Sequence, residues 1–129
     1  MSKIADYMSA PVLTTTPDSR GHDAVEYMYT HNIGALLVKE NEQYVGIITK
    51  ADWMHKVLRG DGDPSVIKVS TIMTAPILTL EKKDSLAKAS DLMKEKKIRH
   101  VAVTDKEKIV GMLSIKDLER YYQSTHRRG

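Results

Sequence analysis

The sequence contains no cysteine among its 129 residues. This absence excludes disulfide bonds, thiolate nucleophiles and cysteine-ligated metals. No apolar run is long enough for a membrane-spanning helix, which needs about 20 residues. The stretch from Met1 to Asp6 also lacks the apolar segment of a signal peptide, so we expect a cytoplasmic protein with no membrane partner.

Aromatic residues are scarce, at 5% of the chain with no phenylalanine, and offer few platforms for stacking nucleobases. Charge is divided unevenly. Residues 1–65 hold 6 basic and 9 acidic side chains, whereas residues 66–129 hold 14 basic and 8 acidic ones. An anionic ligand or partner should prefer the second half. A nucleic-acid-binding accessory that uses this half and the Arg127–Arg128 pair is an alternative function, and the scarcity of aromatics speaks against it.

What the chain does contain is an internal repeat. Shifted by 65 positions, Ile4–Trp53 overlays Val69–Leu118 without a gap, and Val45–Asp52 falls on Val110–Asp117. A gapless repeat predicts one supersecondary unit used twice, and any site in one copy should have a twin in the other. Differences between the twins then become informative.

Each copy shows the signals for a β-α-β-β-α unit, which predicts an α/β (α+β) fold. The domain organisation that we expect is repeat 1 at 1–59, a linker at 60–66, repeat 2 at 67–124 and a basic tail at 125–129. The predicted helices span 21–32, 50–58, 85–97 and 115–123, and the predicted strands span 12–15, 35–39, 44–49, 77–80, 100–104 and 108–113.

A pattern of glycine, two apolar residues, a hydroxyl residue and an aspartate three positions later occurs in both copies, from Gly46 to Asp52 and from Gly111 to Asp117. It lies where a strand ends and a helix begins, and helix N-termini attract anions. Thr49 or Ser114 could donate to a phosphate, and the aspartate could accept from two ribose hydroxyls. Glycine leaves room for a flat ring or a neighbouring backbone. These features together describe a nucleotide site.

The same residues allow a purely structural interpretation. A serine or threonine followed three residues later by an acid resembles a capping box, in which both side chains satisfy free N–H groups at the helix start. Duplication copies a cap as readily as a site. A dimerisation module that binds no ligand therefore remains a further alternative.

Residues 4–123 resemble a tandem pair of CBS domains, the family named after cystathionine β-synthase. The first copy carries the resemblance in Asp6–Met8, Pro11–Val12 and Val45–Asp52. The second copy carries it in Thr71–Ile77, Ile98–Val103 and Val110–Leu118.

The resemblance implies two repeats packed through their sheets into one disc-like module, with two clefts for adenosine-containing ligands such as AMP, ADP, ATP or S-adenosylmethionine. It implies a regulatory protein and not an enzyme, with no catalytic cofactor or metal, which forms a homodimer and acts on an unknown regulated protein. The ligand-binding residues that the resemblance implies are Thr14, Thr49, Asp52, Thr79, Ser114 and Asp117. The charge differences between the two copies add Lys50, Arg99 and His100.

The two copies differ where a ligand would bind. Lys50 in the first motif is replaced by Ile115 in the second, and Gly34-Ala35 is replaced by Arg99-His100. Arginine offers a planar fork that suits phosphate, whereas lysine is a flexible point charge. We therefore expect unequal clefts, with Asp117 and Ser114 as the stronger ribose and phosphate anchor.

Overall fold

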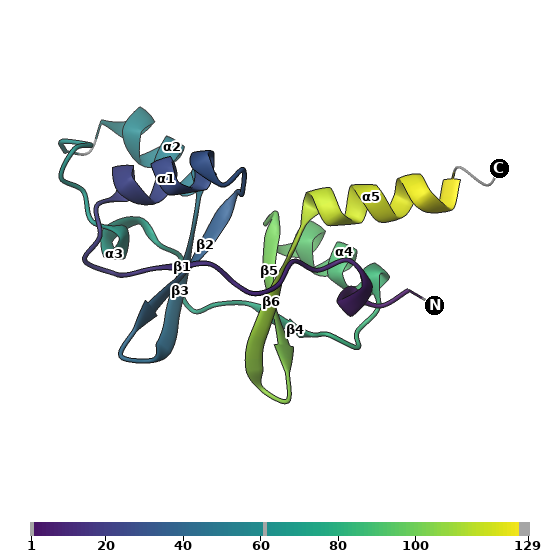
Figure 1. Ribbon diagram of the computed structural model, residues 1–129. Helices are drawn as coiled ribbons and strands as arrows, with labels where there is room; N and C mark the ends of the chain where they lie inside the picture. Colours follow the sequence, from purple (N-terminus) through teal and green to yellow (C-terminus); the bar gives the residue numbers. More distant parts are fainter. Residues whose placement is uncertain (1, 61, 127–129) are drawn as a thin grey trace. The chain divides into compact units, whose positions relative to one another are not determined.

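The computed structural model describes residues 2–60 and 62–126 (Figure 1). It confirms the β-α-β-β-α order in both repeats, and each repeat adds a short helical turn before its first strand. The elements are η1 Ile4–Asp6, β1 Thr14–Thr15, α1 Gly21–Thr30, β2 Ala35–Glu40, β3 Gln43–Thr49, α2 Lys50–Arg59, α3 Val69–Ile72, β4 Thr79–Glu81, α4 Leu86–Lys96, β5 His100–Asp105, β6 Lys108–Ser114 and α5 Ile115–His126.

Two three-stranded mixed sheets have the same topology, β1-β2-β3 and β4-β5-β6. The first strand of each sheet runs parallel to the second, and the second and third form an antiparallel hairpin. Both hairpins turn through two residues with positive φ, Asn41-Glu42 and Lys106-Glu107, as tight hairpins require. The hairpins bring the end of β3 and the end of β6 to the starts of α2 and α5.

The chain divides into two compact units that differ from the two sequence repeats. The α1–α3 unit comprises Leu13–Ile77, and the α4–α5 unit comprises Met1–Val12 together with Leu78–Gly129. The segment that opens each repeat therefore packs in the unit built by the other repeat.

Backbone hydrogen bonds hold each exchanged segment in place. Ser9 and Met112 exchange N–H···O bonds of 2.8 and 2.9 Å in the α4–α5 unit. Thr74 and Ile47 make the equivalent pair, at 2.8 and 2.9 Å, in the α1–α3 unit. The exchange follows the repeat symmetry, because Ser9 and Thr74 are 65 positions apart, as are Ile47 and Met112.

Each unit has its own cluster of buried apolar side chains. Ile4 of η1 is fully buried in the cluster of the α4–α5 unit, and Val69 of α3 is fully buried in that of the α1–α3 unit. The exchanged segments thus contribute to the cores and fix the ends of β3 and β6 from one side.

Candidate functional site

The junction between β3 and α2 forms a complete capping box. The Thr49 N–H donates to Asp52 Oδ2 at 2.9 Å, and the Asp52 N–H donates to Thr49 Oγ1 at 3.1 Å. These bonds satisfy two N–H groups at the helix start. The capping interpretation is therefore realised in the geometry. The Thr49 hydroxyl oxygen accepts one hydrogen bond in it, and so does one oxygen of the half-buried Asp52 carboxylate.

The twin junction between β6 and α5 makes the same cap and adds a cation. Asp117 Oδ2 accepts from the Ser114 N–H at 2.8 Å and from the Ser114 hydroxyl at 3.2 Å. Asp117 Oδ1 accepts from Arg120 Nη2 at 2.9 Å, and the same Nη2 donates to the Tyr7 carbonyl at 3.0 Å. Asp117 is only 8% exposed, so both of its oxygens are engaged in a nearly buried position.

The two aspartates therefore differ in how many of their carboxylate oxygens already accept a hydrogen bond. Within residues 2–60 and 62–126, no hydrogen bond or ion pair reaches the second carboxylate oxygen of Asp52. Position 55, three residues further on, is a histidine, whereas its twin at 120 is the arginine that binds Asp117. In the described part of the chain, one oxygen of Asp52 is therefore open to a further hydrogen-bond donor, whereas both oxygens of Asp117 already accept one.

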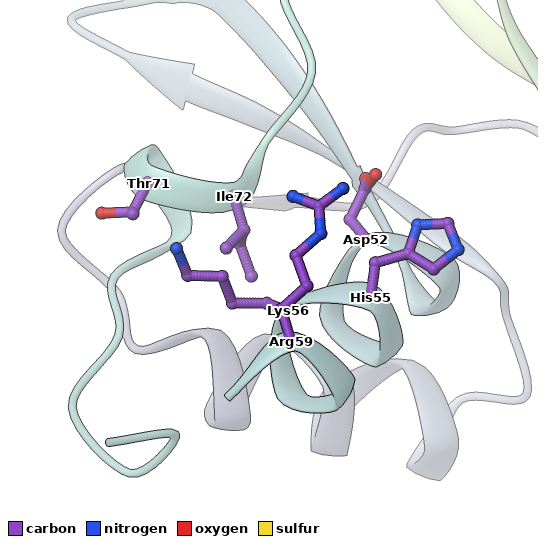
Figure 2. A pocket seen from close by; sticks show the side chains of 6 residues that line it. All are labelled: Asp52, His55, Lys56, Arg59, Thr71 and Ile72. Carbon is purple, nitrogen blue, oxygen red and sulfur yellow. The ribbon is translucent and has the colours of Figure 1, made fainter. Parts of the chain in front are cut away.

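Asp52 also lines a pocket of about 190 Å³ between α2 and α3 (Figure 2). Lys56 and Arg59 extend from α2 toward α3 in the same close-up. Neither cation makes an ion pair within the described residues. The pocket thus offers a carboxylate acceptor beside two basic groups, which suits a ligand that carries both hydroxyls and an anionic group. Its lining residues are Asp52, His55, Lys56, Arg59, Thr71 and Ile72.

Of three other expected site residues, Lys50 begins α2 but turns its side chain away from the cap, and the two threonines lie on the first strand of each sheet. Lys50 directs its ammonium over the ring of Tyr29, 4.7 Å from the centroid. Thr14 and Thr79 are exposed on β1 and β4, where they pair with Leu37 and Ala102. No described hydrogen bond connects these threonines to the strand–helix junctions.

Arg99 and His100 separate in the structure. Arg99 is exposed and lines a second pocket, whose lining includes neither Ser114 nor Asp117. His100 lies opposite Ser114 in the sheet, and its buried Nδ1 has no hydrogen-bond partner among the described residues. Burial, and then the positive charge of Arg99, lower the pKa of His100 to about 4, although Asp117 acts in the opposite direction. His100 is therefore neutral at pH 7.

The two motif glycines accept a neighbouring backbone. A Cβ at Gly46 would lie 2.8 Å from Met73 Sδ and 3.0 Å from the Thr74 carbonyl oxygen. A Cβ at Gly111 would lie 2.8 Å from both Met8 Sδ and the Ser9 carbonyl oxygen. Of the two possibilities the sequence left open, a flat ring or a close backbone, the exchanged segments supply the second.

Several residues of these sites escaped the sequence patterns. Arg120 could have been found, because opposite charges three positions apart on a helix face each other. Met8 and Met73 carried no such signal, because they reach the glycines through the exchange of segments.

In the described part of the chain, no group of three or more His, Asp or Glu side chains could hold a metal ion. No helix there is long and apolar enough to cross a membrane.

The same β-α-β-β-α unit occurs twice, and each copy contains the same strand–helix junction. The chain is therefore a tandem-domain protein. The family described as CBS domain matches residues 4–59 and 69–124. The chain therefore belongs to the CBS-domain family and carries two copies of the domain. The Arabidopsis thaliana protein named CBS domain-containing protein CBSX3, mitochondrial, is 34% identical over 120 residues. That match covers 89% of this chain and 58% of the relative, so the chain spans less than two thirds of that protein.

Solved structures share the fold. The CBS-domain containing protein from Agrobacterium tumefaciens superposes with a TM-score of 0.86 at 25% identity, covering 94% of this chain and 99% of that one. The CBS domain pair of protein MJ0100, solved in complex with 5-methylthioadenosine and S-adenosyl-L-methionine, has a TM-score of 0.86 at 22% identity. The coverage is 96% of this chain and 98% of that pair, and a likeness at this identity shows the fold alone.

Proposed function

We propose that this CBS-domain pair binds an adenosine-containing ligand, either an adenine nucleotide or S-adenosylmethionine, and passes its bound state to a partner protein. The observation that carries the proposal is the carboxylate of Asp52. Among the described residues no group binds its second oxygen, and it lines a pocket with Lys56 and Arg59. A carboxylate can accept from both hydroxyls of a ribose, and the cations suit a phosphate.

The ligands of the MJ0100 complex support the choice of an adenosyl group, since that pair shares the fold. The second junction offers a weaker acceptor in this proposal, because a ribose there competes with Arg120 for Asp117 Oδ1. We further propose that the pair works as a regulator without catalysis of its own, and that it forms a homodimer.

The test is a thermal-shift panel of AMP, ADP, ATP, NADH and S-adenosylmethionine, followed by calorimetry with the best ligand. A ligand at a hundred times its Kd should stabilise the fold by about 2.7 kcal/mol. The Asp52→Asn variant keeps an oxygen that can accept from the Thr49 N–H but loses the charge. We expect it to weaken binding at least roughly tenfold, the equivalent of about 1.4 kcal/mol.

Ser85→Ala is the control, because it removes a capping hydroxyl at the start of α4, where the Lys88 N–H donates to it, and leaves the proposed site unchanged. It should cost stability, by about 0.5–2 kcal/mol for a lost cap, while ligand affinity changes little. If no adenosyl ligand shifts the melting temperature, the ligand-free dimerisation module gains support. If Asp117→Asn abolishes binding and Asp52→Asn does not, the assignment to Asp52 is wrong.

A further inference from the structure

A second pocket, of about 330 Å³, lies in the α4–α5 unit between the C-terminal part of α4 and the start of α5. Its residues fall into two groups. Ser90 and Met93 are buried, and Ile98 and Ile115 are half-buried, whereas Lys94, Lys97 and Arg99 are exposed. The pocket therefore combines a largely apolar floor with a rim of three cations; its lining is Ser90, Met93, Lys94, Lys97, Ile98, Arg99 and Ile115.

The three cations of the rim have no acidic partner within the described residues. None of them takes part in a salt bridge there, and no acidic side chain lines the pocket. Lys97 also has a left-handed backbone, with φ of 55°, at a position where helices usually end in glycine or asparagine. The twin residue, Asn32, has φ of 54° and follows that preference. A lysine is thus present where local conformation alone would favour another residue.

The corresponding part of the α1–α3 unit has different side chains. There, Lys50 lies over the ring of Tyr29. The counterparts of these two residues in the α4–α5 unit are Ile115 and Lys94. In the α4–α5 unit, therefore, lysine stands in place of the tyrosine ring, and an apolar residue stands at the start of α5. Gly34 is likewise replaced by Arg99, so the substitutions add cations around an apolar recess.

We propose that this pocket docks an acidic segment of a partner protein, which inserts one bulky apolar side chain among Met93, Ile98 and Ile115. The recess, of about 330 Å³, has room for a single anchoring side chain. A buried apolar anchor with a charged rim is a common interface design, in which rim charges speed association and select the partner. This docking site specifies the kind of partner protein on which the proposed regulator acts. Only its regulatory role rests on the proposed function; the binding of an acidic segment does not.

The probe is a fluorescent synthetic octapeptide with Phe-Leu at its centre and Glu or Asp on both sides. We expect saturable binding that weakens as salt is raised. Two control peptides separate the contributions. One replaces Phe-Leu by Ser-Ser and keeps the charge, and the other replaces every acid by glutamine and keeps the anchor. Both should bind at least roughly tenfold more weakly if anchor and charge act together.

Lys94→Glu tests the rim, and Lys96→Glu is its matched control. Both residues are exposed on the last turn of α4 and make the same change of charge, but Lys96 does not line the pocket. We expect roughly tenfold weaker peptide binding for Lys94→Glu and little change for Lys96→Glu. The double variant Lys94→Tyr with Ile115→Lys recreates the Tyr29–Lys50 pair and should close the pocket to the peptide.

The nucleotide thermal-shift panel, repeated on Lys94→Glu, separates this inference from the proposed function. An unchanged nucleotide response with lost peptide binding supports a separate docking site. Equal effects of Lys94→Glu and Lys96→Glu, equal binding of the Ser-Ser peptide, or no saturable binding would each overturn the inference. The inference would also be overturned if the peptide still bound the double variant Lys94→Tyr with Ile115→Lys. It would be overturned likewise if self-association of the chain covered the pocket.

Discussion

Asp52 and Asp117 occupy the same register in two copies of one motif, yet a single neighbour gives them different chemistry. Arg120 neutralises Asp117 and ties it to the Tyr7 carbonyl, whereas His55 leaves the second oxygen of Asp52 unbound in the described structure. The Asp117–Arg120 pair is partly exposed at the arginine, so it adds little stability by itself. Its larger effect is to hold the N-terminal segment through the Tyr7 carbonyl and to engage the Asp117 oxygen whose counterpart in Asp52 has no partner among the described residues.

His100 makes stability depend on pH. Its pKa of about 4 in the folded protein lies below the ordinary value of 6.5, so the unfolded chain binds the proton more readily. The contribution of His100 to stability is complete above about pH 6.5 and is lost as the pH falls through about 4. Between pH 7 and pH 5 we expect a loss on the order of 2 kcal/mol, which urea unfolding at the two pH values measures.

The variant His100→Leu should flatten this pH dependence, because the titrating group is gone. His22→Gln changes a surface histidine on α1 and should leave the dependence as it is in the parent protein. An equal loss of stability at pH 5 in His100→Leu and in the parent protein would show that other groups are responsible.

The helices of the two units reach similar packing with different residues. Gly21 at the start of α1 lies against Trp53 of α2, and a Cβ on the glycine would come within 2.8 Å of the indole ring. The twin positions are Leu86 and Leu118, which share one buried cluster. One unit thus pairs the smallest residue with the largest, and the other pairs two leucines of intermediate size.

This compensation predicts a non-additive pair of substitutions. Gly21→Leu should overpack the contact and cost about 1–3 kcal/mol, and Trp53→Leu should leave a void and cost roughly 2 kcal/mol. The double variant copies the leucine pair of the other unit and should recover about 1–3 kcal/mol relative to the sum of the single changes. A double-mutant cycle in urea checks this, and strict additivity would contradict it.

The sequence predicted the main helices and strands because their pattern of apolar and polar residues appears twice. Helix α1 ends at Thr30, earlier than the predicted residue 32, because Asn32 has the left-handed φ of 54°. Helix α5 extends to His126, beyond the predicted residue 123, and residues 127–129 of the expected basic tail lie outside the described structure. The turns η1 and α3 were not predicted, since turns of three and four residues have little helical signal of their own.

The sequence could also not reveal where the opening segments dock. The gapless repeat indicates which segments resemble each other, but Ile4 and Val69 are buried in the units built by the opposite repeats. The candidate site was predicted as a motif, and the motif does form two strand–helix junctions. Its asymmetry depends on Arg120 and on the two pockets, whereas the methionines against the glycines are common to both copies. All of these features require three-dimensional contacts.

At the scale of the whole molecule, α2 presents an apolar surface that the described chain does not cover. The helix has no buried residue. Met54, Val57 and Leu58, which are 57%, 40% and 76% exposed, lie on one side at helical spacings of three and four. Their twins on α5 are Glu119, Tyr122 and Gln123, two of which are polar. Large exposed apolar patches are typical of interaction surfaces, and this stripe is the candidate on α2.

We therefore expect the chain to form a homodimer through α2. Light scattering at micromolar concentration should give about twice the chain mass of 14.5 kDa. Replacing Met54 and Leu58 together by glutamate places like charges in the stripe, and like charges that face each other across an interface disfavour association. This variant should shift the mass to that of the single chain. Gln123→Glu, at the twin position of Leu58, is the matched control and should remain dimeric. A parent protein that runs at 14.5 kDa, or a control that dissociates as readily as the stripe variant, would rule out α2 as the interface.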